Sequence, residues 1–89
     1  MTELELLKKL ALNPNLSKSE MNVVFFTFYE KKNSAEIARY LNWAAPNVAR
    51  LLLTMTTKTL LTRELSSDKK SYLYFANRSS CLLNLEEKP

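Results

Sequence analysis

Three polar residues, Asn47, Arg50 and Thr54, follow one another at spacings of three and four in a segment rich in leucine and alanine. Residues at these spacings are neighbours on a helix surface, so the three are expected on one face. A guanidinium donates two parallel hydrogen bonds to guanine or clamps a phosphate, and amides and hydroxyls suit base edges. The pattern predicts a helix face that contacts DNA, and the alternative is an ordinary solvent-facing surface.

Residues on both sides of this segment extend the candidate surface, small ones before it and basic ones after it. Lys69 and Lys70 fall in a polar stretch between two apolar runs, where a turn would hold them against the DNA backbone or simply in solvent. Ala44 and Ala45, just before Asn47, suit a thymine methyl group or a slim helix tip. The full set of predicted DNA contacts is Ser34, Ala44, Ala45, Asn47, Arg50, Thr54, Lys58, Arg63, Lys69 and Lys70.

The charge distribution favours a polyanionic partner without requiring one. The chain carries a net charge of +4, and residues 18–78 hold ten basic and five acidic residues, a net charge of +5. A basic middle segment is typical of nucleic-acid binding, although a solvated basic surface has the same composition.

Residue types that are missing exclude several classes of function. The chain has no histidine and one cysteine, Cys81, so a His-containing zinc site, a His-based catalytic triad and an intrachain disulfide are impossible. We expect no enzyme activity, cofactor or metal, and Cys81 to act as a small hydrophobic residue. There is no apolar run long enough for a membrane span and no secretory leader, so a cytoplasmic protein without membrane contact is expected.

The elements that would position these residues are mostly helices. The chain has 89 residues and no glycine, which favours one small helical domain over a β-sandwich. Helices are predicted over 2–12, from Lys18 after a Ser17–Glu20 capping box, over 35–41 with Ser34 as cap, and from Pro46. Their predicted inward residues include Leu4, Leu7, Leu10, Met21, Val24, Phe25, Phe28, Ile37, Ala38, Leu41, Val48, Leu51, Leu52 and Met55.

After residue 60 the apolar period changes from that of a helix to that of a strand. Residues 60–65 and 71–76 alternate and are rich in β-prone side chains, so they predict a hairpin with one face against the helices. A last helix is predicted over 81–87. Trp43, between two helices, is expected in the core, where it would seal the turn. The fold class is therefore mainly α with a small β-hairpin, an α+β domain.

The order of helix, short helix, turn, helix and hairpin is that of a winged helix-turn-helix. Residues 16–76 resemble the DNA-binding core of the MarR-type (multiple antibiotic resistance regulator) proteins. The resemblance rests on four segments with matching spacing, which are Leu16–Met21, Ala35–Leu41, Asn47–Leu52 and Leu60–Arg63. Where the family usually has glycine this chain has Asn42 and Thr59, and a β-branched residue at 59 disfavours a left-handed conformation there.

The resemblance implies a sequence-specific double-stranded DNA-binding protein, a homodimeric transcription regulator of the kind found in prokaryotes, plasmids and phages. The alternative is a winged-helix protein-interaction module, or a replication-initiation accessory protein, that does not recognise DNA sequence itself. We expect one domain over 1–89, with its core at 16–76 and flanking helices at 2–12 and 80–87. Surplus apolar residues predict an exposed dimer interface formed by Leu4, Leu7, Leu10, Val23, Phe26, Leu82, Leu83 and Leu85.

Overall fold

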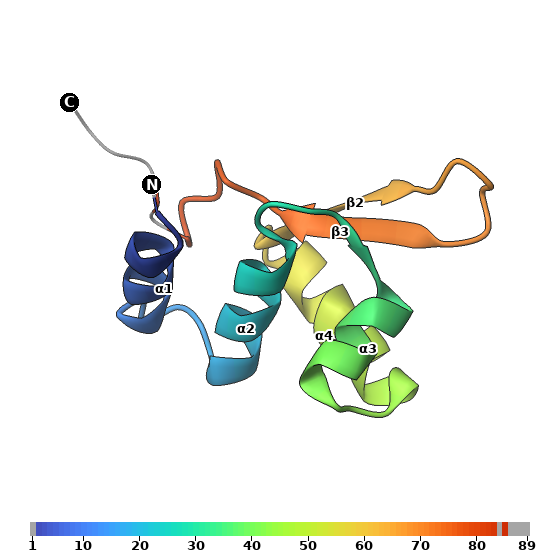
Figure 1. The fold of residues 1–89 in the computed structure, drawn as a ribbon, viewed down its shortest axis with the longest axis horizontal. Coiled ribbons are helices and arrows are strands. Elements are labelled where there is room, and N and C mark those ends of the chain that lie inside the picture. Colours follow the sequence, from blue (N-terminus) through green and yellow to red (C-terminus); the bar gives the residue numbers. More distant parts are fainter. Residues whose placement is uncertain (1, 84, 86–89) are drawn as a thin grey trace.

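The structure, a computed structural model, describes residues 2–83 and 85 of the chain. Within these residues, four helices and a three-stranded antiparallel sheet form an α+β domain of about 41 × 25 × 23 Å (Figure 1). The elements are α1 (Glu3–Ala11), α2 (Lys18–Thr27), β1 (Lys32–Asn33), α3 (Ser34–Leu41), α4 (Ala45–Thr57), β2 (Leu61–Leu65) and β3 (Tyr72–Ala76). The α+β class predicted from the sequence is confirmed.

Side-chain caps fix where the first three helices begin. The predicted capping box of Ser17 and Glu20 is present at the start of α2, and Thr2 forms another at the start of α1. The cap of α3 is Asn33, which corrects the expectation of Ser34. The Asn33 side-chain oxygen accepts the Glu36 N–H at 2.8 Å, while the Glu36 carboxylate accepts the Asn33 N–H at 3.0 Å. An Asn three residues before a Glu satisfies both ends of a capping box, so the helix starts one residue early.

A short turn connects α3 to α4. Asn42 ends α3 in the left-handed conformation, with φ 58° and ψ 45°, as expected of the residue that best replaces glycine there. Pro46 lies in the first turn of α4, where a missing N–H costs no hydrogen bond. The turn therefore holds the start of α4 in a fixed direction relative to α3.

The sheet contains the predicted hairpin and one strand that the sequence did not predict. Its strand order is β1-β3-β2, and Lys32 lies opposite Tyr74 in the β1–β3 register. Two residues are too few to show a strand period, which is why β1 has no signal in the sequence. Tyr74 and Ala76 belong to the face of β3 that packs on the helices.

Helix α2 is buried on two sides because it lies between α1 and the rest of the fold (Figure 1). Val23, predicted to lie in an exposed dimer interface, is instead fully buried beside Val24 and Thr27. The partner that covers this second side is α1, which buries Leu6 and Leu10 rather than Leu4 and Leu7.

The segment after β3 was predicted to form a helix over 81–87. Its described part contains no helix. Residues 81–83 form turns, and residues 84, 86 and 87 of the predicted helix lie outside the described residues. Leu83 and Leu85 are buried in the core. The Asn13 side-chain amide donates to the carbonyls of Leu82 and Leu83 at 2.8 and 3.0 Å, which ties this segment to the end of α1.

Thr59, between α4 and β2, corrects another expectation. It adopts φ 65° although it is β-branched. The amide of Leu60 donates to the Met55 carbonyl at 2.9 Å, and the Asn77 side chain donates to the Thr59 carbonyl at 2.9 Å. These contacts outweigh the steric cost of the left-handed conformation, so the link takes the shape that a glycine would allow.

None of the helices formed by residues 2–83 and 85 has the length and apolar character needed to cross a membrane.

Candidate nucleic-acid interface

The orientation of α4 is fixed by its apolar side. Val48, Leu52 and Met55 are buried in the core. Asn47, Arg50 and Thr54 are exposed, as their spacing predicts. The Thr54 hydroxyl donates to the Arg50 carbonyl at 3.0 Å, which leaves its oxygen free to accept a further bond. Ala44, Ala45 and Pro46 are exposed as well, so the first turns of α4 offer small or polar side chains to a partner.

A shallow hollow lies at the beginning of α4. It has a volume of about 460 Å³, and its lining residues are Asn42, Trp43, Ala44, Asn47 and Arg50. The Trp43 side chain was predicted to lie in the core, but the residue is 39% exposed. Its backbone N–H donates to the Ala38 carbonyl at 3.0 Å, so the backbone closes the turn while the ring stays at the surface. A tryptophan beside a turn can be buried or exposed, and which of the two applies depends on how the neighbouring elements pack. The sequence alone therefore did not predict the exposure of Trp43.

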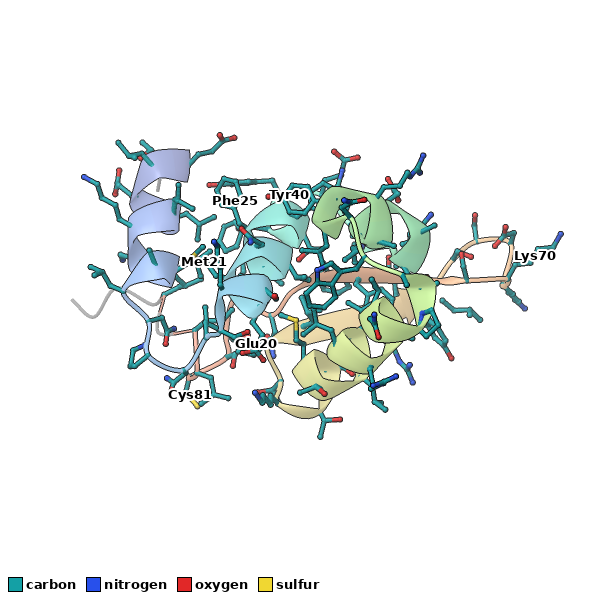
Figure 2. All side chains as sticks on the ribbon, turned by 90° about the horizontal axis from the view of Figure 1, so that it is seen from below. Glu20, Met21, Phe25, Tyr40, Lys70 and Cys81 are labelled. Carbon is teal, nitrogen blue, oxygen red and sulfur yellow. The ribbon has the colours of Figure 1, made fainter. Side chains whose placement is uncertain are left out.

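The β2–β3 hairpin supplies cations close to this helix. Because side chains alternate along a strand, Arg63 shares the helix-facing side of the sheet with Leu61. Its guanidinium lies 4.3 Å from the centre of the Tyr72 ring, a cation–π contact that limits its movement. Lys69 and Lys70 are exposed in the hairpin loop, and Figure 2 shows Lys70 extending from the end of the molecule.

Hydrogen bonds give the hairpin loop a defined shape. The Ser66 N–H donates to the Ser71 carbonyl at 2.8 Å, and the Lys69 N–H donates to the Ser66 carbonyl at 2.9 Å. Asp68 accepts from the Ser66 hydroxyl and from the Lys70 N–H, and these bonds hold the pKa of its carboxyl below the usual value. The loop thus presents both lysines from a closed turn.

The first turn of α4 and the hairpin loop both lie in the half of the molecule that is away from α1, the former at the lower edge of Figure 1 and the latter at its right end. Within residues 2–83 and 85, salt bridges engage Lys31, Lys32 and Lys58 with Glu64, Glu30 and Glu20. In the same part of the chain, the salt bridges include none from Arg50, Arg63, Lys69 or Lys70. Arg50 on α4 and Arg63, Lys69 and Lys70 on the hairpin therefore lie outside these salt bridges, as do Lys8, Lys9, Lys18, Arg39 and Arg78 elsewhere in the described chain.

Lys58 lies apart from the other predicted contacts. It caps the far end of α4, and its ammonium is 3.0 Å from the buried Glu20 carboxylate. Burial raises the pKa of the Glu20 carboxyl, but hydrogen bonds from Ser17 and Lys58 outweigh burial and hold the pKa below its ordinary value. Lys58 therefore ties α4 to α2, and we do not assign it to the interface. Ser34 is exposed as the first residue of α3, next to β1.

The residues predicted to form one exposed dimer patch are divided between surface and core. Leu4 is 62% and Leu7 39% exposed on α1. The half-buried Phe26 stacks on Tyr40 with ring centres 4.0 Å apart, and Leu82 is half-buried. The remaining four, Leu10, Val23, Leu83 and Leu85, are buried inside the chain. These four side chains pack within their own chain. The exposed part of the predicted patch is therefore Leu4 and Leu7.

The polar side chains of this surface are mostly hydrogen-bond donors and cations. Its polar groups are guanidinium, ammonium, amide and hydroxyl groups, which donate to phosphate oxygens and base edges. In the part of the chain that the structure describes, no cluster of three acidic or cysteine side chains is arranged to hold a metal ion. Cys81, expected to behave as a small hydrophobic residue, is exposed.

No protein-family model matches the chain, and a search of curated proteins finds no relative of it.

Proposed function

We propose that the protein binds double-stranded DNA as a winged helix-turn-helix domain. In this arrangement α3 and α4 form the helix-turn-helix unit, α4 enters the major groove, and the β2–β3 hairpin is the wing beside it. The element order, the tight turn at Asn42 and the hairpin next to α4 are compatible with this assignment. The MarR-type resemblance of residues 16–76 supports the same fold.

The observation that supports DNA binding most strongly is the position of the unpaired cations. Arg50 on α4, Arg63 on the neighbouring strand β2, and Lys69 and Lys70 in the hairpin loop are exposed and lie outside the salt bridges formed by the described residues. Lysine and arginine side chains held this way neutralise phosphates and release counterions, which accounts for most of the affinity for DNA. Asn47 and Arg50, at the start of α4, are placed to contact base edges.

A fluorescence polarisation titration with a labelled random duplex at low salt tests this proposal. Binding is expected below micromolar protein, and selection from a random pool should then yield a preferred site. Arg50→Ala should weaken binding to that site by about 1–3 kcal/mol and leave random duplex less affected. Lys8→Ala, on α1 at the other end of the molecule, is the control. Failure of the wild type to bind any duplex at micromolar protein would contradict the proposal.

We further propose that the protein acts as a homodimeric transcription regulator. One small domain covers one half-site, and such domains gain affinity and specificity by pairing about a two-fold axis. The exposed Leu4 and Leu7 of α1 are the available part of the predicted interface. Sedimentation equilibrium at tens of micromolar should give twice the chain mass of 10.3 kDa, and Leu4→Glu with Leu7→Glu should give the monomer. A wild type that sediments as a monomer excludes the dimer.

One observation favours the alternative, a winged-helix module that binds a protein. Leu53 is 63% exposed on α4, and an apolar side chain of this size is more typical of a protein interface than of a DNA contact. The duplex titration distinguishes the two, because a module that binds only a protein should bind no duplex; if the wild type does bind, Leu53→Ser should leave duplex binding unchanged when Leu53 lies outside the groove.

A further inference from the structure

Trp43 is the side chain at the candidate interface whose position the sequence did not predict. Its backbone is held by two hydrogen bonds at the end of α3, from Asn42 N–H to the Arg39 carbonyl at 3.2 Å and from Trp43 N–H to the Ala38 carbonyl at 3.0 Å. With the backbone fixed, the ring has little freedom beyond its two side-chain torsions. An exposed aromatic ring on a fixed backbone loses little entropy when it binds, which is what makes tryptophan effective at interfaces.

The surroundings of the ring combine apolar and polar groups. Trp43 lines two hollows, one with Ala44, Asn47 and Arg50, and another with Lys18, Ser19, Asn22, Tyr40 and Leu41. Trp43 therefore lies at the boundary between the two hollows. On the α4 side, the apolar surfaces of Trp43 and Ala44 lie next to the two side chains best suited to base edges.

We propose that Trp43 contacts the 5-methyl group of a thymine next to the base pair that Arg50 contacts. The inference rests on the proposed function, because it places α4 in the major groove. Among the base-edge groups of that groove, the thymine methyl group is the apolar one, and the others are hydrogen-bond donors and acceptors. The indole beside Ala44 offers a large apolar face and a single N–H donor, so most of its surface complements a methyl group rather than a phosphate, which binds hydrogen-bond donors and cations. Trp43 is thus a specificity residue and not a source of general affinity.

The first experiment uses the wild-type protein alone. Trp43 is the only tryptophan in the chain, so its fluorescence reports on this position without any label. The protein is titrated with the strongest duplex recovered from a random pool, and tryptophan emission is followed beside the anisotropy of the duplex. The emission is expected to change in step with the anisotropy, because the ring passes from water to the DNA surface.

The second experiment tests the thymine methyl group directly. The same duplex is made with deoxyuridine in place of the single thymidine next to the base pair whose preference Arg50→Ala removes, which takes away one methyl group and keeps all hydrogen-bonding groups. Removing one buried methyl is expected to weaken wild-type binding about fourfold. Trp43→Ala should bind the two duplexes equally, whereas Tyr29→Ala, a matched change of an aromatic residue that is 53% exposed after α2, should keep the wild-type preference. Thermal melting verifies that both variants fold.

The outcomes separate this inference from the proposed function. If duplex binds but the Trp43 emission stays constant, or if the wild type binds both duplexes equally, the inference is wrong and DNA binding stands. A thymine preference that persists in Trp43→Ala also overturns it. If no duplex binds, the proposed function fails and the inference fails with it.

Discussion

Glu20 is a buried acid with two separate tasks at the start of α2. It is 5% exposed, accepts the Ser17 N–H at 2.9 Å as part of the capping box, and pairs with Lys58 at 3.0 Å. A buried carboxylate is stable only when its oxygens are hydrogen-bonded or paired with a cation, and here both conditions hold. The sequence predicted the cap but not the ion pair, because Lys58 is 38 residues away.

The lowered pKa of Glu20 predicts how acid affects folding. The folded carboxyl has a pKa below its ordinary value of 4.5, so the unfolded chain binds more protons as the pH falls through this range. The Glu20 contribution to stability is therefore complete above about pH 5 and is lost as the pH falls toward the folded pKa. Glu20→Gln should lower the free energy of unfolding by about 1–2 kcal/mol at pH 7 and by much less near pH 3.

Urea unfolding at pH 7 and pH 3 measures this difference. Lys58→Met removes the same ion pair from the other side and should reproduce part of the destabilisation at pH 7. If the wild type and Glu20→Gln lose equal stability between the two pH values, Glu20 does not stabilise the fold through its charge.

The left-handed conformation of Thr59 predicts that a glycine at this position makes the protein more stable. A non-glycine residue in the left-handed conformation costs about 1–2 kcal/mol, part of which Thr59→Gly should recover. The change also removes the contact between the Thr59 and Ser80 hydroxyls at 3.3 Å and makes the unfolded chain more flexible. We expect a net gain of about 0.5–1 kcal/mol, measured by thermal or urea unfolding.

Thr57→Gly is the matched control for this change. Thr57 lies two residues earlier, as the last residue of α4, where the backbone is helical, so a glycine gains nothing and adds freedom to the unfolded chain. The control should lose stability by an amount similar to the gain at 59. Equal losses for the two variants would show that the Thr59 conformation costs nothing.

At the scale of elements, the hairpin is an arm that presents charge. Its strands are fixed by the β2–β3 register and its loop by hydrogen bonds among Ser66, Asp68 and Ser71, so Lys69 and Lys70 are held in a closed turn at its end. Such side chains bind phosphates and carry no base information.

Lys69→Ala combined with Lys70→Ala should weaken all duplexes by a similar factor. Each phosphate that the variant no longer neutralises should reduce the slope of log affinity against log salt by about 0.9. Polarisation titrations at four or five salt concentrations give this slope. Lys8→Ala with Lys9→Ala is the matched pair on α1 and should leave the slope unchanged. If the hairpin variant keeps the wild-type slope, the hairpin loop stays in solvent.

Elements with a clear period could be predicted from the sequence, whereas those set by distant contacts could not. The helices, the αL residue Asn42 and the two hairpin strands all have local signals in residue spacing and turn chemistry. Strand β1 is two residues long and exists because β3 lies beside it. The double-sided burial of α2, which includes Val23, similarly depends on where α1 packs.

In the candidate interface too, local sequence signals predicted some features, whereas features set by distant contacts were not predicted. The exposure of Asn47, Arg50 and Thr54 was predictable, because it follows from the period of α4. The exposure of Trp43 and the pairing of Lys58 with Glu20 depend on the packing of neighbouring elements, so residue type alone predicted the wrong environment for Trp43 and no partner for Lys58.

At the scale of the whole molecule, the two ends of the long axis differ in chemistry. The hairpin loop with Lys69 and Lys70 lies at one end, and α1 with the exposed Leu4 and Leu7 lies at the other (Figure 1). The α1 end also exposes Glu3, Glu5 and Lys8, so it combines apolar and charged side chains. Under the proposed function, a molecule 41 Å long would allow DNA to be bound at the hairpin end and a second copy of the chain at the α1 end without competition.

The contact between Asn13 and the carbonyls of Leu82 and Leu83 has a further consequence for how fast the chain folds and unfolds. It joins residues 69 and 70 positions apart, almost the full length of the described chain. Closing so long a loop costs entropy that nearby contacts do not require, so we expect this contact to form after the folding transition state. A contact made late affects the unfolding rate and leaves the refolding rate nearly unchanged.

Asn13→Ala should therefore speed unfolding in stopped-flow measurements, at a cost in stability of about 1–3 kcal/mol, because two carbonyls at least partly shielded from water would be left without their donor. Asn15→Ala, which removes a longer bond of 3.3 Å to the Leu82 carbonyl at the surface, should have a smaller effect. Refolding that slows in proportion to the decrease in stability would place the contact early instead. A contact that forms late in folding must break before the transition state of unfolding is reached. The lifetime of the folded protein therefore depends on how rarely the hydrogen bonds from Asn13 break.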